Sequence, residues 1–84
     1  MTDVLFVDDN DESRAVFETT FRLEGIDVAS LPSGAEALIW LHENRPKVIV
    51  IDLAMPVLDG LKTVKEIRRN ERLLESPPAI ISFF

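Results

Sequence analysis

The stretch VIVID, from Val48 to Asp52, places four β-branched apolar residues directly before an aspartate. Four residues are too few for a helix, and the run has no polar alternation, so it predicts a strand buried on both faces. The stretch VLFVDD, from Val4 to Asp9, has the same pattern of an apolar run that ends in acid. Because strands of this kind lie inside parallel sheets, we expect the two strands to be central and adjacent.

Helix-length amphipathic segments alternate with short apolar runs along the rest of the chain. The expected strands lie at residues 4–7, 26–29, 48–51 and 79–84, and the expected helices at residues 12–24, 35–42 and 60–76. The second strand alternates in polarity, as an edge strand does. Strands that alternate with helices predict an α/β fold, in which right-handed crossovers place helices on the faces of a parallel sheet.

Two helices carry more specific signals. In the first helix, Val16, Thr20 and Leu23 form one stripe with Phe17 and Phe21 beside it, and the two phenylalanines are expected to be core residues. Before the second helix, Ser33 and Glu36 have the spacing of a capping box, which predicts that the helix begins there.

Length and composition restrict the class of protein. The chain has 84 residues, a formal net charge of −6 and no cysteine, which fits a single domain without disulfides, cysteine zinc ligands or a cysteine nucleophile. The acidic balance argues against direct binding of nucleic acid. No apolar run approaches the ~20 residues that span a bilayer, and a basic signal-peptide opening is absent. We therefore expect no membrane partner and a cytoplasmic location.

Three acidic residues follow the two central strands, namely Asp8, Asp9 and Asp52. Carboxyl ends of adjacent parallel strands lie side by side, so these carboxylates are expected to converge in one crevice. They would repel one another, and a divalent cation such as Mg²⁺ would remove the conflict. A carboxylate beside Mg²⁺ can act as a nucleophile toward a phosphoryl group. The alternative is that residues 8–11 cap a helix and Asp52 is a turn residue.

The motif VLFVDDN at residues 4–10 resembles the opening of a response-regulator receiver domain. The segment from Val48 to Asp52, followed by Met-Pro at 55–56 and Asp-Gly at 59–60, is similar to the phosphorylation-site segment of that family. The resemblance covers the whole chain. It implies a flavodoxin-like sheet of strand order 2-1-3-4-5, of which this chain would contain four strands in the order 2-1-3-4 and three helices.

The resemblance also implies roles for individual residues. Asp52 matches the phosphoacceptor, which takes a phosphoryl group from a sensor histidine kinase or a phosphotransfer protein. Asp9 matches the direct Mg²⁺ ligand, Asp8 its acidic neighbour, and the backbone carbonyl of Ala54 a third protein ligand to the metal, beside Asp52. The domain is then a regulatory phosphoacceptor and not an enzyme, beyond self-catalysed phosphotransfer.

A hydroxyl residue completes the site in this family by turning toward the phosphoryl group. Ser82 lies 30 residues after Asp52 and matches this switch residue without a gap. Counting from Pro78 gives an alternative register that would place Phe83 there instead. We prefer Ser82 because it supplies the hydroxyl.

The chain departs from the family pattern after the fourth strand. The fifth strand and its lysine have no counterpart, so residues 1–84 are interpreted as a partial receiver domain without a second domain. Phosphorylation is expected to be impaired. The open, apolar edge at residues 79–84 predicts a homodimer or a strand-exchanged oligomer.

Two other functions are consistent with parts of the sequence. One is a receiver-like interaction or dimerisation module without phosphotransfer. The other is a fragment of a haloacid-dehalogenase-type phosphohydrolase, because Asp9-x-Asp11-x-Ser13 resembles the Asp-x-Asp-x-Thr signature of that family. In that family the nucleophile directly follows the strand, which would make it Asp8, and the residue two positions later is Asn10 instead of an aspartate.

Overall fold

Strands and helices alternate along the chain in the computed structural model, which describes residues 2–53, 55, 59–70 and 77–83. The elements are β1 (Val4–Val7), α1 (Asp11–Leu23), β2 (Val28–Leu31), α2 (Gly34–Trp40), β3 (Val48–Asp52), α3 (Asp59–Arg69) and β4 (Ala79–Phe83). Within these ranges no helix has the length and apolar character needed to cross a membrane.

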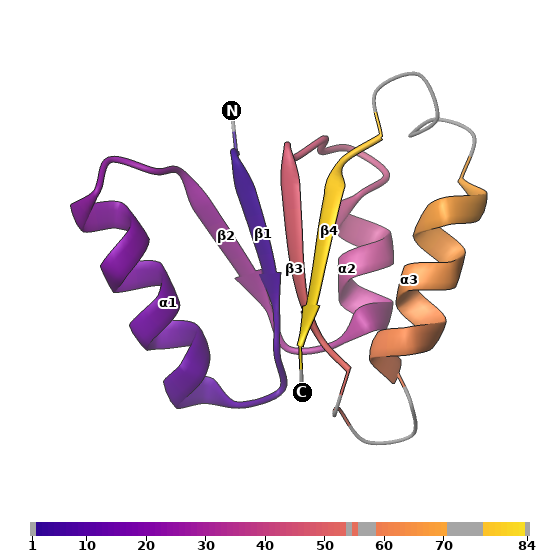
Figure 1. The fold of residues 1–84 in the computed structure, drawn as a ribbon, viewed down its shortest axis with the longest axis horizontal. Helices are drawn as coiled ribbons and strands as arrows, with labels where there is room; N and C mark the ends of the chain where they lie inside the picture. Colours follow the sequence, from indigo (N-terminus) through magenta and orange to yellow (C-terminus); the bar gives the residue numbers. More distant parts are fainter. Residues whose placement is uncertain (1, 54, 56–58, 71–76, 84) are drawn as a thin grey trace.

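The four strands form one parallel sheet in the order β2-β1-β3-β4 (Figure 1). This confirms the predicted order and the central position of the two apolar strands that end in acid. The second strand is at the edge, as expected, but it covers residues 28–31 instead of 26–29. The reason is that Val4 pairs with Val28, while the carbonyl of Asp27 accepts hydrogen bonds from the backbone N–H groups of Asp3 and Val4, at 2.8 and 3.1 Å.

The main hydrophobic core lies between the sheet and the pair α2 and α3. Alternate residues of the central strands point to this side and are fully buried. The core residues are Leu5, Val7, Ala37, Leu41, Ile49, Ile51, Met55 and Ile67. Helix α2 begins where the capping-box spacing predicts, because the hydroxyl oxygen of Ser33 accepts a hydrogen bond from the N–H of Glu36 at 3.2 Å.

Helix α1 covers the opposite face of the sheet, across from α2 and α3 (Figure 1). Its contact with the sheet is aromatic: the ring of Phe17 stacks on Phe6 of β1 at 4.0 Å and on Phe21 at 4.2 Å. The two phenylalanines thus pack as expected, whereas Val16 and Leu23 of the neighbouring stripe are 66% and 82% exposed. Stacked aromatic rings supply most of the described contact between α1 and β1.

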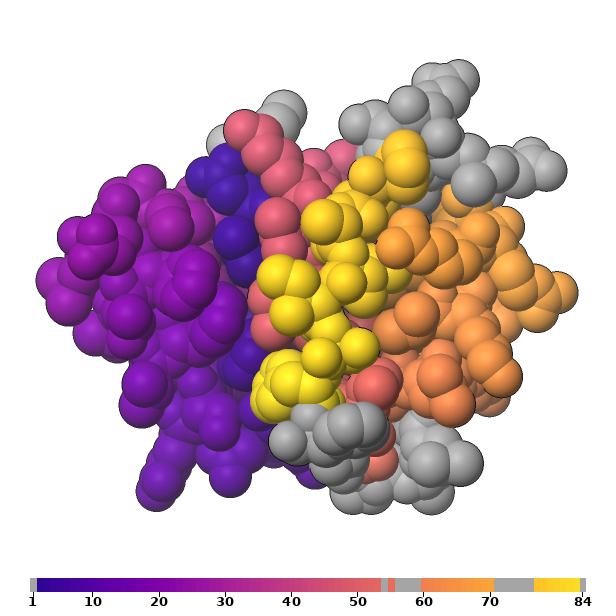
Figure 2. Space-filling view, viewed as in Figure 1, coloured from indigo at the N-terminus to yellow at the C-terminus, as the bar shows by residue number. Residues whose placement is uncertain are grey.

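Strand β4 lies at the surface between α1 and α3 (Figure 2). It is an edge strand of the described sheet, and Ala79, Ile81 and Ser82 are exposed. Phe83 packs inward, and its ring stacks on that of Phe6 at 5.9 Å. The expected homodimer through this strand stays a prediction.

Candidate functional site

The pairing of β1 with β3 brings the acidic residues together. Val7 lies opposite Ile51 in this parallel pair, so Asp8 and Asp52 follow at the same level of the sheet. Asp9 adds a third carboxylate. Each of the three aspartates offers an oxygen within 4.8 Å of the oxygens offered by the other two. The convergence predicted from the sequence is thus present at the carboxyl edge of the sheet.

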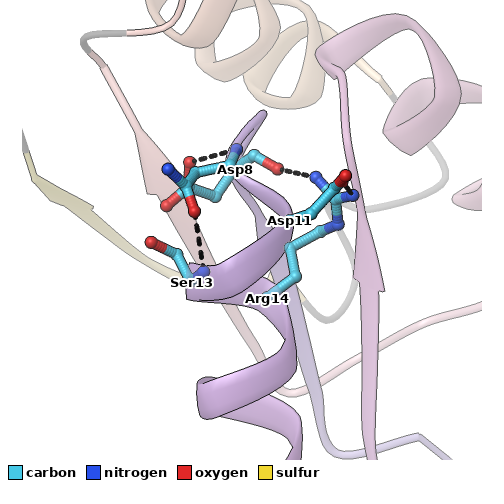
Figure 3. Close-up of polar contacts among 5 residues, drawn as sticks. Asp8, Asp11, Ser13 and Arg14 are labelled. Carbon is cyan, nitrogen blue, oxygen red and sulfur yellow. Dashed lines mark hydrogen bonds and ion pairs between the residues drawn. The ribbon is translucent and has the colours of Figure 1, made fainter.

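The turn between β1 and α1 orients the first two acids. The N–H of Asn10 donates to Oδ1 of Asp8 at 3.0 Å, and Oδ1 of Asn10 accepts from the N–H of Ser13 at 2.9 Å, which caps α1 (Figure 3). Capping of α1 and convergence of the three carboxylates are therefore compatible. Asn10 caps the helix, and Asp9 remains exposed.

Asp8 is the buried member of the cluster, with 4% of its surface exposed. Burial raises the pKa of its carboxyl group above the usual range, and the hydrogen bond from Asn10 opposes this. The charge of Asp52, a hydrogen bond with that carboxyl group and the charge of Asp9 raise the pKa further. A small divalent cation would relieve this repulsion, and three carboxylates at this spacing are the oxygen ligands that such a cation takes.

The register of β4 determines which of its residues lies opposite Asp52, the phosphoacceptor candidate. Asp52 lies opposite Phe83, and Ser82 lies one step earlier, opposite Ile51. Because side chains alternate along a strand, Ser82 points to the opposite face from Asp52 and Phe83, and it is exposed. The pairing thus favours the alternative register counted from Pro78. The switch role of Ser82 stays a prediction that this register does not support.

The turn after β3 holds two further residues of interest. Ala54, the expected carbonyl ligand, lies outside the described residues. Gly60, near the start of α3, was not assigned a role from the sequence, although it belongs to the Asp-Gly motif. A Cβ at Gly60 would lie 2.3 Å from the carbonyl oxygen of Asp52 and 2.9 Å from Cα of Leu53. Only glycine allows α3 to approach the backbone of the phosphoacceptor candidate this closely.

Arg14 is a second residue that the sequence did not single out. Its Nη1 donates to the backbone carbonyl of Asp8 at 2.6 Å, and its Nη2 pairs with the carboxylate of Asp11 (Figure 3). Asp11 and Arg14 are three residues apart, a spacing at which two side chains can form an ion pair on a helix. The hydrogen bond to the carbonyl of Asp8 depends on the conformation of the turn between β1 and α1, which this spacing does not reveal.

The lysines of the chain, at positions 47, 62 and 65, all lie in the described ranges. Lys47 precedes β3 at the end of the strand away from Asp52, where its Nζ is 3.8 Å from a carboxylate oxygen of Asp3. Lys62 and Lys65 are exposed on α3. Within the described residues, no lysine therefore takes the position that a fifth-strand lysine has in the family pattern.

Comparison with known proteins identifies the family. The family model described as response regulator receiver domain matches residues 4–82. The chain belongs to this family. The transcriptional regulatory protein PrrA from Mycobacterium tuberculosis is 49% identical over 79 residues, which cover 94% of this chain and 33% of PrrA. The chain thus spans about a third of the length of such relatives.

Solved structures support the fold of the receiver domain. The chemotaxis response regulator CheY4 of Vibrio cholerae matches with a TM-score of 0.84 and 33% identity, over 98% of this chain and 67% of CheY4. The receiver domain of Ssk1 from Saccharomyces cerevisiae, solved with the histidine phosphotransfer signaling protein Ypd1, matches with a TM-score of 0.85 and 28% identity. The match covers 96% of this chain and 61% of that receiver-domain chain. The receiver domain therefore has the flavodoxin-like architecture predicted from the sequence.

Proposed function

We propose that this receiver domain accepts a phosphoryl group on Asp52 in the presence of Mg²⁺. The observation that carries the proposal is the convergence of three carboxylates at the carboxyl edge of two central strands. Asp8 and Asp9 would hold the metal ion together with Asp52, and the backbone carbonyl of Ala54 is the further ligand that the family pattern suggests. When bound, Mg²⁺ supplies positive charge that offsets the negative charge of the phosphoryl oxygens.

Asp52 has the properties of a nucleophile for this reaction. Asp52 is partly exposed, so a phosphorylated donor can reach it. An Oδ oxygen of Asp52 forms a bond to phosphorus while the bond between phosphorus and the nitrogen of a donor histidine breaks, and the imidazole leaves with a proton from solvent. The product is an acyl phosphate on the aspartate, so the domain is a regulated acceptor and not an enzyme that turns over a substrate.

The donor that we propose is a histidine kinase or a histidine phosphotransfer protein in the cytoplasm. Support comes from the complex of the Ssk1 receiver domain with Ypd1, because that domain shares the architecture described above. Two observations argue against phosphohydrolase activity at Asp8. Asp8 is buried. Such an enzyme would also need an aspartate at position 10, where this chain has Asn10, whose side chain caps α1.

The test is phosphoryl uptake from acetyl phosphate, followed by intact mass, with Mg²⁺ and with a chelator. The wild type is expected to gain one phosphoryl group only with Mg²⁺, and Asp52→Asn is expected to gain none. Asp27→Asn is the matched control, because Asp27 is exposed before β2 at the opposite end of the sheet. It should label like the wild type.

The outcomes separate the candidate functions. Equal labelling of the wild type and Asp52→Asn would refute Asp52 as the acceptor. A wild type that neither binds Mg²⁺ nor takes up a phosphoryl group would favour an interaction module without phosphotransfer. Turnover of a phosphate ester that requires Asp8 but not Asp52 would favour the phosphohydrolase.

A further inference from the structure

The guanidinium group of Arg14 lies against the turn that carries two of the three acids. It donates from Nη1 to the carbonyl oxygen of Asp8 at 2.6 Å, and from Nη2 to the carboxylate of Asp11 (Figure 3). The side chain of Arg14 is only 16% exposed, whereas that of Arg22, two turns later on α1, is 64% exposed. Arg14 is therefore packed against the turn, unlike the solvated arginine further along the helix.

The carbonyl that Arg14 contacts has a particular place in the site. The C=O of Asp8 belongs to the peptide plane that joins Cα of Asp8 to Cα of Asp9. A hydrogen bond that fixes this plane restricts both carboxylates at once, because each side chain starts from one end of the same rigid unit. The bond from Asn10 to Oδ1 of Asp8 then limits the remaining rotation of the buried carboxyl group.

The chemistry of arginine suits this position. A guanidinium is a planar fork of five N–H donors that can hold two acceptors in a fixed arrangement, which the ammonium of lysine does not. The pairing with Asp11 balances the positive charge of Arg14. The arginine can thus hold the turn in place without presenting an unpaired cation that competes with a metal ion for the acidic cluster.

We infer that Arg14 is a positioning residue for the metal site, acting through the peptide between Asp8 and Asp9. This inference rests on the proposed function, because it assumes that the three aspartates bind Mg²⁺. Groups that hydrogen-bond to metal ligands and orient them, without touching the metal, commonly contribute about 10- to 100-fold to metal affinity. Arg14 contacts a backbone carbonyl and no ligand oxygen, so we expect an effect near the lower limit.

The test compares Mg²⁺ dissociation constants, measured by calorimetry on the purified chain, for the wild type and two variants. Arg14→Met removes the fork and is expected to raise the dissociation constant about 10-fold. Arg14→Lys keeps the charge but reaches one acceptor only, and it should give an intermediate value. Arg22→Met is the matched control, because it removes an equally basic side chain from the same helix, and its dissociation constant should equal that of the wild type.

A second measurement separates positioning from a general loss of structure. With acetyl phosphate, the Mg²⁺ concentration for half-maximal phosphoryl uptake should rise with the dissociation constant, while the rate at saturating Mg²⁺ stays near that of the wild type. Unchanged Mg²⁺ affinity in both Arg14 variants would overturn the inference, as would an equal loss in Arg22→Met. If Arg14→Met does not fold, Arg14→Lys alone decides, and affinity equal to the wild type overturns the inference. A wild type that binds no Mg²⁺ would instead refute the proposed function.

Discussion

Replacement of Gly60 by alanine is expected to disturb Asp52, the proposed phosphoacceptor, more than the overall fold. The added Cβ would lie 2.3 Å from the carbonyl oxygen of Asp52 and 2.9 Å from Cα of Leu53. Ordinary contacts begin near 3.4 Å, so the start of α3 and the end of β3 must separate by about 1 Å. Both groups that Cβ meets are backbone atoms, which cannot rotate away as a flexible side chain can.

Two opposing free-energy terms determine the effect on stability. Alanine is favoured over glycine inside a helix by about 1 kcal/mol. Overpacking in a closely packed region costs roughly 1 to 3 kcal/mol, and Gly60 is buried against backbone, so this term should dominate. We expect a net loss of about 0 to 2 kcal/mol in the free energy of unfolding. A displacement of about 1 Å at Asp52 can also lower the rate of phosphoryl uptake by on the order of 100-fold.

The assay combines urea unfolding with phosphoryl uptake from acetyl phosphate in Mg²⁺. Gly25→Ala is the matched control: its φ of +78° disfavours a side chain, but nothing lies within 4 Å of the added Cβ. Gly25 follows α1 at the end of the sheet opposite the acids, so this variant should lose about 1 kcal/mol of stability and keep the wild-type rate. A Gly60→Ala protein with wild-type stability and rate would refute the steric reasoning.

Two further substitutions test the electrostatics of the cluster and the capping of α2. Asp8→Asn should raise the free energy of unfolding in a chelator at neutral pH by about 1 to 3 kcal/mol, and it should weaken Mg²⁺ binding. The magnitude is the repulsion of two charges at the upper limit of the oxygen spacing, 4.8 Å, for effective dielectric constants of about 80 to 20. A less stable Asp8→Asn in urea unfolding would contradict this. Ser33→Ala removes the acceptor for the N–H of Glu36 and should cost about 1 kcal/mol in the same assay, without changing phosphoryl uptake. An unchanged urea midpoint would show that the cap is unimportant.

The fold could be predicted because its strongest signals are local and periodic. The apolar runs before Asp8 and Asp52 identified the central strands, and the alternation of elements determined the parallel sheet. The rotation of α1 was predicted only in part, because the two phenylalanines were expected in the core but the exposure of the neighbouring stripe was not foreseen. An aliphatic stripe and an aromatic stripe were both available on that helix, and the choice depends on stacking between Phe17 and Phe6, which are distant in sequence. Periodicity alone contains no information about such a partner.

The candidate site was predictable to the extent that it depends on strand ends. The convergence of the three aspartates follows from the pairing of two strands, each of which is recognisable by itself. The residue of β4 that lies opposite Asp52 was not predictable, because the sequence allows two registers of this strand. A shift of one residue between them exchanges Ser82 for Phe83. Arg14 and Gly60 were missed since their contacts are made with backbone atoms of residues six and eight positions away.

These backbone contacts show how a cluster of like charges can be held together in this fold. Repulsion among the three carboxylates tends to separate the turn after β1 from the end of β3. Arg14, on the helix that follows β1, holds the carbonyl of Asp8, and Gly60, on the helix that follows β3, allows α3 to pack against the carbonyl of Asp52. The backbone that carries Asp8 and the backbone that carries Asp52 are thus each contacted by the helix that follows in sequence. If the cluster binds a cation as proposed, carboxylates that are already held close reduce the free energy needed to order the site.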